Sequence, residues 1–264
     1  VEAGPDGNAH RILRTYTRMG LLSATSDPSV RGIAQTLAVR PVGNIIATTQ
    51  KFGGEWAPGP DTRVDVAFFE RNGLRHGGFT LAGSDLPAVV AWNADGSVLA
   101  VCYTHESHSV LQLWNTGNYH WYRKQELVLP RINYICWHSA EPLTLLVAHE
   151  HATETHVLYS STACSTGTPP HDAACAAVID GADILLTPFR LQNVPPPMCT
   201  YTLRTNGQVP RHIAWTSKSG ESTDIIALLY SDEVHCWQIE YGSLDVRGSA
   251  RKQLAPQLIA ATPA

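Results

Sequence analysis

The 264-residue sequence has few charged side chains and no long apolar run. Asp, Glu, Lys and Arg make up 16% of it, and the formal net charge at pH 7 is −4. Because a protein that binds phosphate backbones needs a basic face, this balance argues against a nucleic-acid interface. No stretch of about 18 apolar residues occurs, so the sequence predicts no membrane partner, and no signal-peptide pattern opens the chain.

Paired cysteines and glycosylation sequons are also missing. The six cysteines stand singly and none forms a C-x-x-C pair, which argues against a zinc knuckle or ribbon. The chain contains no Asn-x-Ser/Thr sequon. We therefore expect a reduced compartment, the cytoplasm and also the nucleus, in which these cysteines remain thiols: Cys102, Cys136, Cys164, Cys175, Cys199 and Cys236.

Motifs for catalysis and cofactor binding are absent as well. There is no G-x-S-x-G nucleophile elbow, and no carboxylate pair or Cys/His arrangement stands out. The Gly- and Pro-rich stretch from Gly53 to Pro60 lacks the following helix and the Lys-Ser/Thr pair of a phosphate-binding loop. We expect no catalytic residue and no cofactor.

One group of histidines resembles a metal site. His149 and His151 would share a face if they lay in a strand, and His156 follows five residues later. No third ligand is evident, and the surrounding pattern is that of a loop. We expect no metal ion here.

The sequence is rich in strand patterns with turn residues between them. From Val110 to Leu127 it reads VLQLWNTGNYHWYRKQEL, which alternates along its first half and places a turn at Asn115–Asn118. Asn72-Gly73 between two apolar runs predicts a type I′ hairpin, and Asp180-Gly181 predicts another turn.

These hairpins recur at a regular interval. The residues that end the first strand of each unit are Val39, Trp92, Trp137, Ile179 and Trp215, and their spacing scatters around the roughly 40 to 45 residues of a four-stranded propeller blade. No segment holds a 3.6-residue period over three turns. The sequence therefore predicts an all-β fold, a WD-repeat-like β-propeller of about five blades plus a half-blade. Either one propeller arc or parts of two tandem propellers would fit.

The expected domain layout has three parts. Residues 1–9 are polar and Gly-rich and predict a disordered stub, residues 10–248 hold the blades, and residues 249–264 predict an irregular tail or a truncated blade. The chain begins with Val in the middle of a strand pattern, which suggests a fragment of a longer protein.

Two stretches are candidates for a partner-binding surface. The run from Tyr119 to Tyr122 with the basic residues after it could stack single-stranded bases, pack between blades or bind a protein, because Tyr, Trp and Arg are enriched at interfaces. The Val194–Met198 stretch predicts a stiff polyproline II segment, either a rigid loop or a docking element. The candidate surface consists of Tyr119, Trp121, Arg123, Pro195, Pro196 and Pro197.

Several longer blocks are similar to the Elongator complex subunit 1 family, also called IKAP. They occur in the family's order: RPVGNIIATTQ, FFERNGLRHGGFTL, WNADGSVLAV, LQLWNTGNYHWYRKQ, and VIDGADILLTPF with VPPPMCTY. These are not generic WD-repeat patterns. Val39 stands where the family usually has Trp, and Met19 stands where an acidic residue is common.

The resemblance implies part of an N-terminal region that holds two WD-like propellers in tandem. It implies a non-catalytic scaffold subunit that supports 5-carboxymethyl-type modification of the tRNA wobble uridine through contacts with the second WD-repeat subunit and the catalytic third subunit. The family's dimerisation region and basic tRNA-contacting region lie beyond this stretch, so tRNA would be reached only indirectly. The alternatives are a generic interaction propeller of another complex and a propeller-fold hydrolase.

Overall fold

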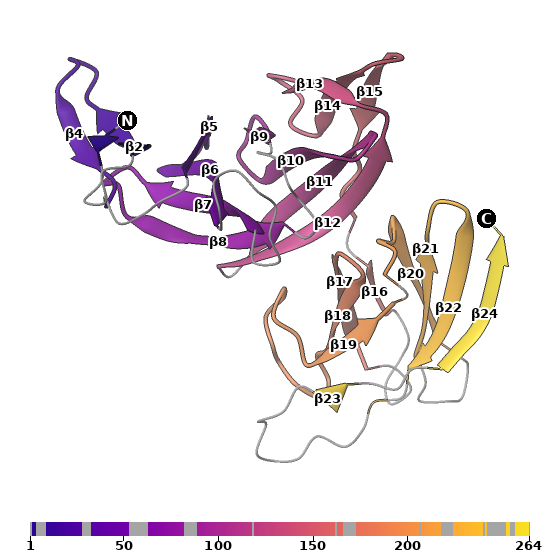
Figure 1. The fold of residues 1–264 in the computed structure, drawn as a ribbon. Coiled ribbons are helices and arrows are strands. Elements are labelled where there is room, and N and C mark those ends of the chain that lie inside the picture. Colours follow the sequence, from indigo (N-terminus) through magenta and orange to yellow (C-terminus); the bar gives the residue numbers. More distant parts are fainter. Residues whose placement is uncertain are drawn as a thin grey trace. The chain divides into compact units, whose positions relative to one another are not determined.

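The structure, a computed structural model, describes residues 2–3, 9–27, 33–52, 63–81, 89–117, 119–161, 163–165, 173–205, 207–217, 224–239, 241, 252–253 and 257–263. All of its regular elements in these ranges are β-strands (Figure 1). Within them there is also no helix that could cross a membrane. The all-β prediction is confirmed for the described part of the chain.

The chain divides into two compact units. The first comprises Val1–Trp114 with Leu127–Tyr159, and the second comprises Asn115–Glu126 with Ser160–Ala264. The split agrees with the alternative that parts of two propellers are present.

Most of the first unit consists of antiparallel sheets whose strands follow one another in sequence. Two strand pairs come first: β1 (Glu2–Ala3) with β2 (Ala9–His10), and β3 (Arg14–Tyr16) with β4 (Leu22–Thr25). A four-stranded sheet follows: β5 (Ile33–Val39), β6 (Ile45–Phe52), β7 (Arg63–Glu70) and β8 (Arg75–Leu81). The next is β9 (Val89–Trp92), β10 (Val98–His105), β11 (His108–Gly117) and β12 (His120–Leu129), of which Asn115–Glu126 belongs to the second unit. The last is β13 (Ile132–Trp137), β14 (Thr144–His149) and β15 (Thr153–Val157).

The second unit contains two larger sheets. The first is ordered β16 (Ala163–Cys164), β17 (Cys175–Asp180), β18 (Asp183–Pro188), β19 (Tyr201–Arg204) and β23 (Lys252–Gln253). The second is ordered β20 (His212–Ser217), β21 (Asp224–Leu229), β22 (Glu233–Ile239) and β24 (Gln257–Pro263). In the described ranges, five sheets of three or more strands and the β3–β4 pair match the predicted five blades and a half-blade.

One of the recurring residues, Trp137, joins two neighbouring sheets of the first unit. Trp137 closes β13, and its indole N–H donates to the carbonyl oxygen of Ala91 on β9 at 3.1 Å. Buried Asn93 accepts from the Val98 N–H at 2.9 Å and donates to the carbonyl oxygen of Pro142 at 3.0 Å. Because a buried amide must be hydrogen-bonded, these contacts fix the register of one sheet on the next.

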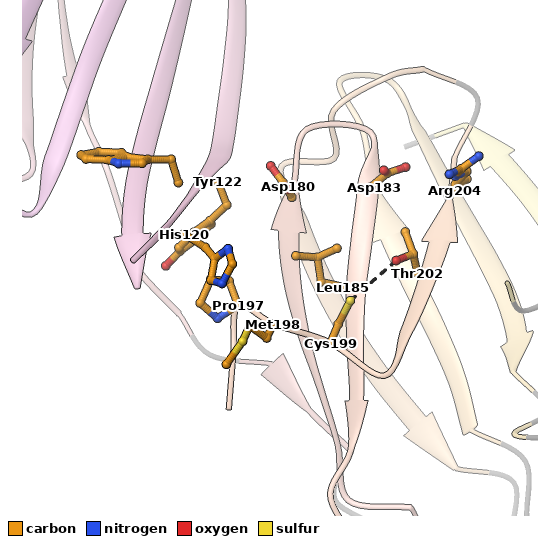
Figure 2. A pocket seen from close by; sticks show the side chains of 11 residues that line it. His120, Tyr122, Asp180, Asp183, Leu185, Pro197, Met198, Cys199, Thr202 and Arg204 are labelled. Carbon is orange, nitrogen blue, oxygen red and sulfur yellow. Dashed lines mark hydrogen bonds between the residues drawn. The ribbon is translucent and has the colours of Figure 1, made fainter. Parts of the chain in front are cut away.

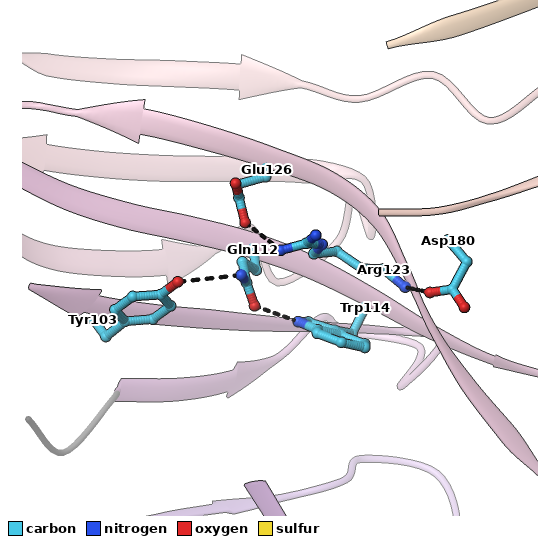
Figure 3. Close-up of polar contacts among 6 residues, drawn as sticks. All are labelled: Tyr103, Gln112, Trp114, Arg123, Glu126 and Asp180. Carbon is cyan, nitrogen blue, oxygen red and sulfur yellow. Dashed lines mark hydrogen bonds and ion pairs between the residues drawn. The ribbon is translucent and has the colours of Figure 1, made fainter. Parts of the chain in front are cut away.

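A second polar contact lies inside the sheet β9–β12 (Figure 3). Gln112 is buried on β11, and its amide donates to the Tyr103 hydroxyl at 3.3 Å. Its carbonyl oxygen accepts from the Trp114 indole N–H at 3.0 Å, and the Trp114 ring stacks on Phe79 with centroids 3.8 Å apart. Both the amide nitrogen and the carbonyl oxygen of Gln112 therefore have hydrogen-bond partners on aromatic side chains.

The core of the second unit lies between its two sheets. β17, β18 and β19 contribute one set of buried side chains, and β20, β21 and β22 contribute the other, as strand alternation requires. The buried members are Cys175, Ile179, Ile184, Leu186, Tyr201, Leu203, Ile213, Ile226, Leu228, Tyr230, Trp237 and Ile239.

Two local predictions differ from the structure. The Asn72-Gly73 loop is not a type I′ turn: only Gly73 has a positive φ, of +85°, and its N–H donates to the Glu70 carbonyl. β11 continues through Gly117, so the hairpin turn lies later than predicted. At the two ends of the chain, β1 pairs with β2, and β24 is an outer strand of its sheet.

Candidate partner-binding pocket

The sheet β16–β19 has one face toward the core and one face away from it. Because side chains alternate along a strand, β18 buries Ile184 and Leu186 and turns Asp183 and Leu185 to the other face. Arg204 on β19 lies opposite Asp183 in the register, and Thr202 lies opposite Leu185. The outer face therefore carries the charged pair Asp183 and Arg204 beside the less polar pair Leu185 and Thr202.

A cavity of about 320 Å³ lies over this outer face (Figure 2). Three consecutive residues of β12, three strands of the sheet (β17, β18 and β19) and the segment before β19 form its walls. The carboxylates on both sides of the β17–β18 loop belong to the lining, and so do an imidazole and a thiol. The lining residues are His120, Trp121, Tyr122, Asp180, Asp183, Leu185, Pro197, Met198, Cys199, Thr202 and Arg204.

The loop that joins β17 and β18 holds β12 in place. Asp180 and Asp183 are paired residues that close a two-residue loop, in which Gly181 has φ +62°. The Gly181 N–H donates to the carbonyl oxygen of Arg123 at 2.7 Å, and the Arg123 N–H donates to Asp180 Oδ1 at 3.0 Å. These two bonds position the neighbouring Tyr122 beside the cavity.

The polar groups of the cavity are partly desolvated. Burial raises the pKa of the Asp180 carboxyl, and the nearby Asp183 raises it further, whereas the bond from the Arg123 N–H and the charge of Arg123 oppose both effects. Burial, with the charge of Asp180 as a smaller cause, raises the pKa of the Tyr122 phenol. Cys199 Sγ lies 3.6 Å from Thr202 Oγ1, and no hydrogen bond joins this thiol to a histidine among the described residues (Figure 2). The arrangement is suited to recognition of a charged group.

The residues of the predicted run from Tyr119 to Tyr122, and Arg123 after it, lie in different surroundings. Trp121 lines the cavity, whereas Tyr119 lies in the hairpin turn with φ +63° and is 91% exposed. Arg123 does not line it: its guanidinium pairs with Glu126, and its backbone contacts the loop at Asp180 (Figure 3). This run thus supplies one wall of the cavity through His120, Trp121 and Tyr122.

The predicted triproline segment contributes one residue. Pro197 is buried in the cavity wall, whereas Pro195 is exposed and Pro196 is half-buried, and neither lines it. Residues 196–198 form a turn and the Pro196–Pro197 peptide bond is cis, so the segment is not the extended polyproline II rod that we predicted. The structure therefore brings together Trp121 and Pro197 of the six predicted residues.

Sequence reasoning missed the charged part of the site. Asp180 and Asp183 flank the predicted turn, so their pairing could have been read from the loop length. Arg204 could not be placed in this way, because it reaches the site only through the register of β18 with β19.

Of the histidine group, His149 ends β14 and His156 lies on β15, whereas His151 lies in the loop between them, as predicted. His149 Nε2 is 3.2 Å from Glu154 Oε1, and His156 Nε2 is 3.0 Å from Glu154 Oε2. The pKa of Glu154 is lowered by the bond from His149 and by the charges of both histidines. In the described ranges, no group of three or more His, Cys, Asp or Glu residues has the geometry of a metal site.

Comparison with known proteins gives the fold a class and a family. Residues 1–140 match the family model described as the ELP1 first N-terminal beta-propeller, and residues 178–259 match the ELP1 N-terminal second beta-propeller. The chain is thus a tandem propeller segment.

Named relatives agree with the family models. Elongator complex protein 1 of Schizosaccharomyces pombe is 38% identical over 205 residues, covering 77% of this chain and 15% of that protein. The mouse protein is 39% identical over 212 residues, with 73% and 15% covered, and the rabbit protein is 36% identical over 253 residues, with 89% and 18% covered. This chain belongs to the Elongator complex protein 1 family, and it spans less than a fifth of the length of these relatives.

Proposed function

We propose that this chain is the propeller portion of a non-catalytic scaffold subunit of Elongator. The scaffold supports 5-carboxymethyl-type modification of the tRNA wobble uridine by holding other proteins. The match to both family propellers, in their order along the chain, is the observation that carries this proposal.

The proposed partners are the second WD-repeat subunit and the catalytic third subunit. The net charge of −4 argues against a basic face for tRNA, and contact with tRNA is assigned to regions outside this stretch. Homodimerisation of the full-length protein is likewise assigned to regions outside it. The proposed location is the cytoplasm, with a share in the nucleus.

A capture experiment tests the proposal. This chain replaces the matched 205 residues of the S. pombe relative, and the tagged chimera is purified from cells that lack the native subunit. We expect the second and third Elongator subunits to co-purify in amounts close to those captured by the native protein. A soluble chimera that recovers neither subunit would contradict the proposal.

A matched variant controls for folding. Ile226 is fully buried in the core of the second unit, and Ile226→Asp places a charge there, which abolishes packing. Its capture of partners should fall sharply, whereas Tyr159→Phe at a 91% exposed position should capture as well as the unmodified chimera. A hydrolase is tested separately with generic glycoside and peptide substrates, and turnover of either by the purified chain would favour that alternative.

A further inference from the structure

We infer that the outer edge of the sheet β13–β15 joins two copies of this chain, with β15 of one copy pairing antiparallel to β15 of the other. The inference goes beyond the proposed scaffold function and does not depend on it. The contact is also distinct from the homodimerisation that is assigned to regions outside this stretch.

The sheet β13–β15 has an open edge. It holds three strands, whereas the sheets β5–β8 and β9–β12 each hold four. Within the described ranges, β15 pairs with β14 on one side and with no strand on the other. The outer row of N–H and C=O groups on such a strand is a template for a further strand.

The bonds to β14 determine which groups of β15 point outward. The His149 N–H donates to the carbonyl oxygen of Ala152 at 2.9 Å, one residue before β15 begins. Because the bonding direction alternates along an antiparallel strand, the next residues directed toward β14 are Glu154 and His156. The residues that direct their backbone groups to the open side are Thr153, Thr155 and Val157.

β15 lacks the features that usually protect an exposed edge. It contains no Pro, Gly or Lys, and its register with β14 is unbroken. Other outer strands differ: β8 contains Gly77 with φ +127° and shifts its register, and β24 shifts its register and ends at Pro263. The one carboxylate of β15, on Glu154, contacts His149 and His156 of its own sheet. β15 can therefore accept another strand.

The sequence of β15 is complementary to itself. When two copies run antiparallel and are centred on Thr155, this residue faces its own equivalent, and Thr153 faces the partner's Val157. These are pairs of β-branched side chains, which suit a pleated surface. On the other face, Glu154 lies opposite the partner's His156. The two-fold symmetry repeats this pair, so a carboxylate faces an imidazole twice.

The charged residues select this register over its neighbours. The outward backbone groups are every second residue, so the two-fold axis can move only to Glu154 or to His156. The first shift would place two carboxylates directly opposite each other, and the second would do the same with two imidazoles. Like charges in such positions are destabilising, and both shifts also shorten the overlap of the two strands.

Sedimentation velocity of the full 264-residue chain tests the inference. A reductant is present, so that the exposed Cys136 and Cys164 do not form disulfides between copies. Over about a hundredfold rise in protein concentration, we expect the average mass to increase from 28.7 kDa toward twice that value.

Thr155→Pro is the decisive variant. It removes the outward N–H at the centre of the contact and leaves the bonds from β15 to β14 in place, because Pro is accommodated in edge strands when its nitrogen faces solvent. We expect it to weaken dimerisation at least tenfold. Thr155→Val keeps the N–H and is the matched control, and it should dimerise like the unmodified chain. Near-UV circular dichroism verifies that each variant is folded.

A charge swap tests the register and serves if Thr155→Pro fails to fold. His156→Glu places Glu154 opposite a second carboxylate and should weaken dimerisation at least tenfold. The double variant Glu154→His with His156→Glu restores the opposite pairs and should bring the affinity back to within about threefold of the original.

Three results would overturn the inference. One is a chain that stays monomeric over the whole range, with its β15 edge left to a strand of another protein. The second is a dimer whose affinity is unchanged in folded Thr155→Pro, which would place the contact on another surface. The third is a double charge swap that is no tighter than His156→Glu alone.

Discussion

The guanidinium of Arg40 lies over the indole ring of Trp92, 5.2 Å from the ring centroid, and its Nε donates to the carbonyl oxygen of Gly96 at 2.7 Å. Arg40 follows β5, whereas Trp92 and Gly96 belong to β9 and the turn after it. One side chain thus joins two adjacent sheets of the first unit. It does so through a cation–π contact and a charged hydrogen bond.

Loss of this side chain should weaken the first unit. We expect Arg40→Ala to lower the free energy of unfolding by about 1–3 kcal/mol, because the contact with Trp92 and the bond to the Gly96 carbonyl are both lost. Urea denaturation followed by tryptophan fluorescence measures the change. Arg18→Ala, at an exposed position, is the control and should alter stability by less than about 0.5 kcal/mol. Equal effects of the two substitutions would contradict the role of Arg40.

A tyrosine donates a hydrogen bond to a buried carboxylate in the second unit. The Tyr241 hydroxyl donates to Asp224 Oδ2 at 2.8 Å, and Asp224 is 1% exposed. Tyr241→Phe removes this donor without changing the packing of the ring, so it should cost about 1–3 kcal/mol of unfolding free energy. Urea denaturation should show no such loss for Tyr159→Phe, at a 91% exposed position. Indistinguishable midpoints for the two variants would refute this dependence.

Burial of the Cys102 thiol should make it lose its proton at a higher pH than an exposed thiol. Burial raises its pKa from 9.0 to about 11, so the folded state retains this proton longer than the unfolded chain does. Its contribution to stability is therefore complete below pH 9.0 and declines as the pH rises toward about 11. At pH 9, iodoacetamide should modify Cys102 at least tenfold more slowly than the exposed Cys136 and Cys164, as measured by peptide mass spectrometry. Equal rates in the folded protein would rule out this burial.

Because the pKa of Asp180 is raised, ionisation of this carboxyl should destabilise the fold, whereas ionisation of a salt-bridged carboxylate stabilises it. The folded state binds this proton more tightly than the unfolded state, so ionisation of Asp180 reduces stability as the pH rises above its ordinary value of 3.8. Asp180→Asn removes the charge and keeps the acceptor for the Arg123 N–H. At pH 7 it should therefore be at least as stable as the unmodified chain, and any gain should vanish below pH 3.8.

Asp95 provides the matched control for that pH dependence. Bonds from Ser97 lower the pKa of its carboxyl, so its charged form stabilises the β9–β10 turn. Asp95→Asn should lower stability at pH 7, and the loss should shrink as the pH falls below 3.8 and then through the lower pKa of the folded state. Thermal unfolding of both variants across pH 3 to 7 compares the two signs, and a loss of stability for Asp180→Asn at pH 7 would contradict the assignment.

Much of the architecture could be predicted because local signals agreed with one another. Alternating apolar residues located the strands, and the recurrence that ends in Trp92 and Trp137 gave the blade interval. At one of these positions the structure shows a contact between two sheets, since the Trp137 indole N–H donates to the carbonyl oxygen of Ala91. The type of the loop at Gly73 could not be predicted, because its bond to Glu70 depends on the backbone path and not on the Asn-Gly pair.

The candidate site was predictable only in part. The aromatic arm and the prolines were visible as unusual composition, and Trp121 and Pro197 do line one cavity. Their meeting point is a property of the tertiary fold, because more than seventy residues separate them in sequence. The register that places Arg204 opposite Asp183 spans the long segment between β18 and β19, and sequence patterns do not fix it.

The most direct test of the scaffold role is the level of wobble-uridine modification in cells. The S. pombe chimera that carries this chain is expressed in place of the native subunit, and the modified nucleosides of total tRNA are quantified by mass spectrometry. We predict 5-carboxymethyl-type nucleosides near the native level for the chimera, and a level close to that of the subunit deletion for its Ile226→Asp variant. A chimera that co-purifies with the second and third subunits but restores none of the modification would contradict the account.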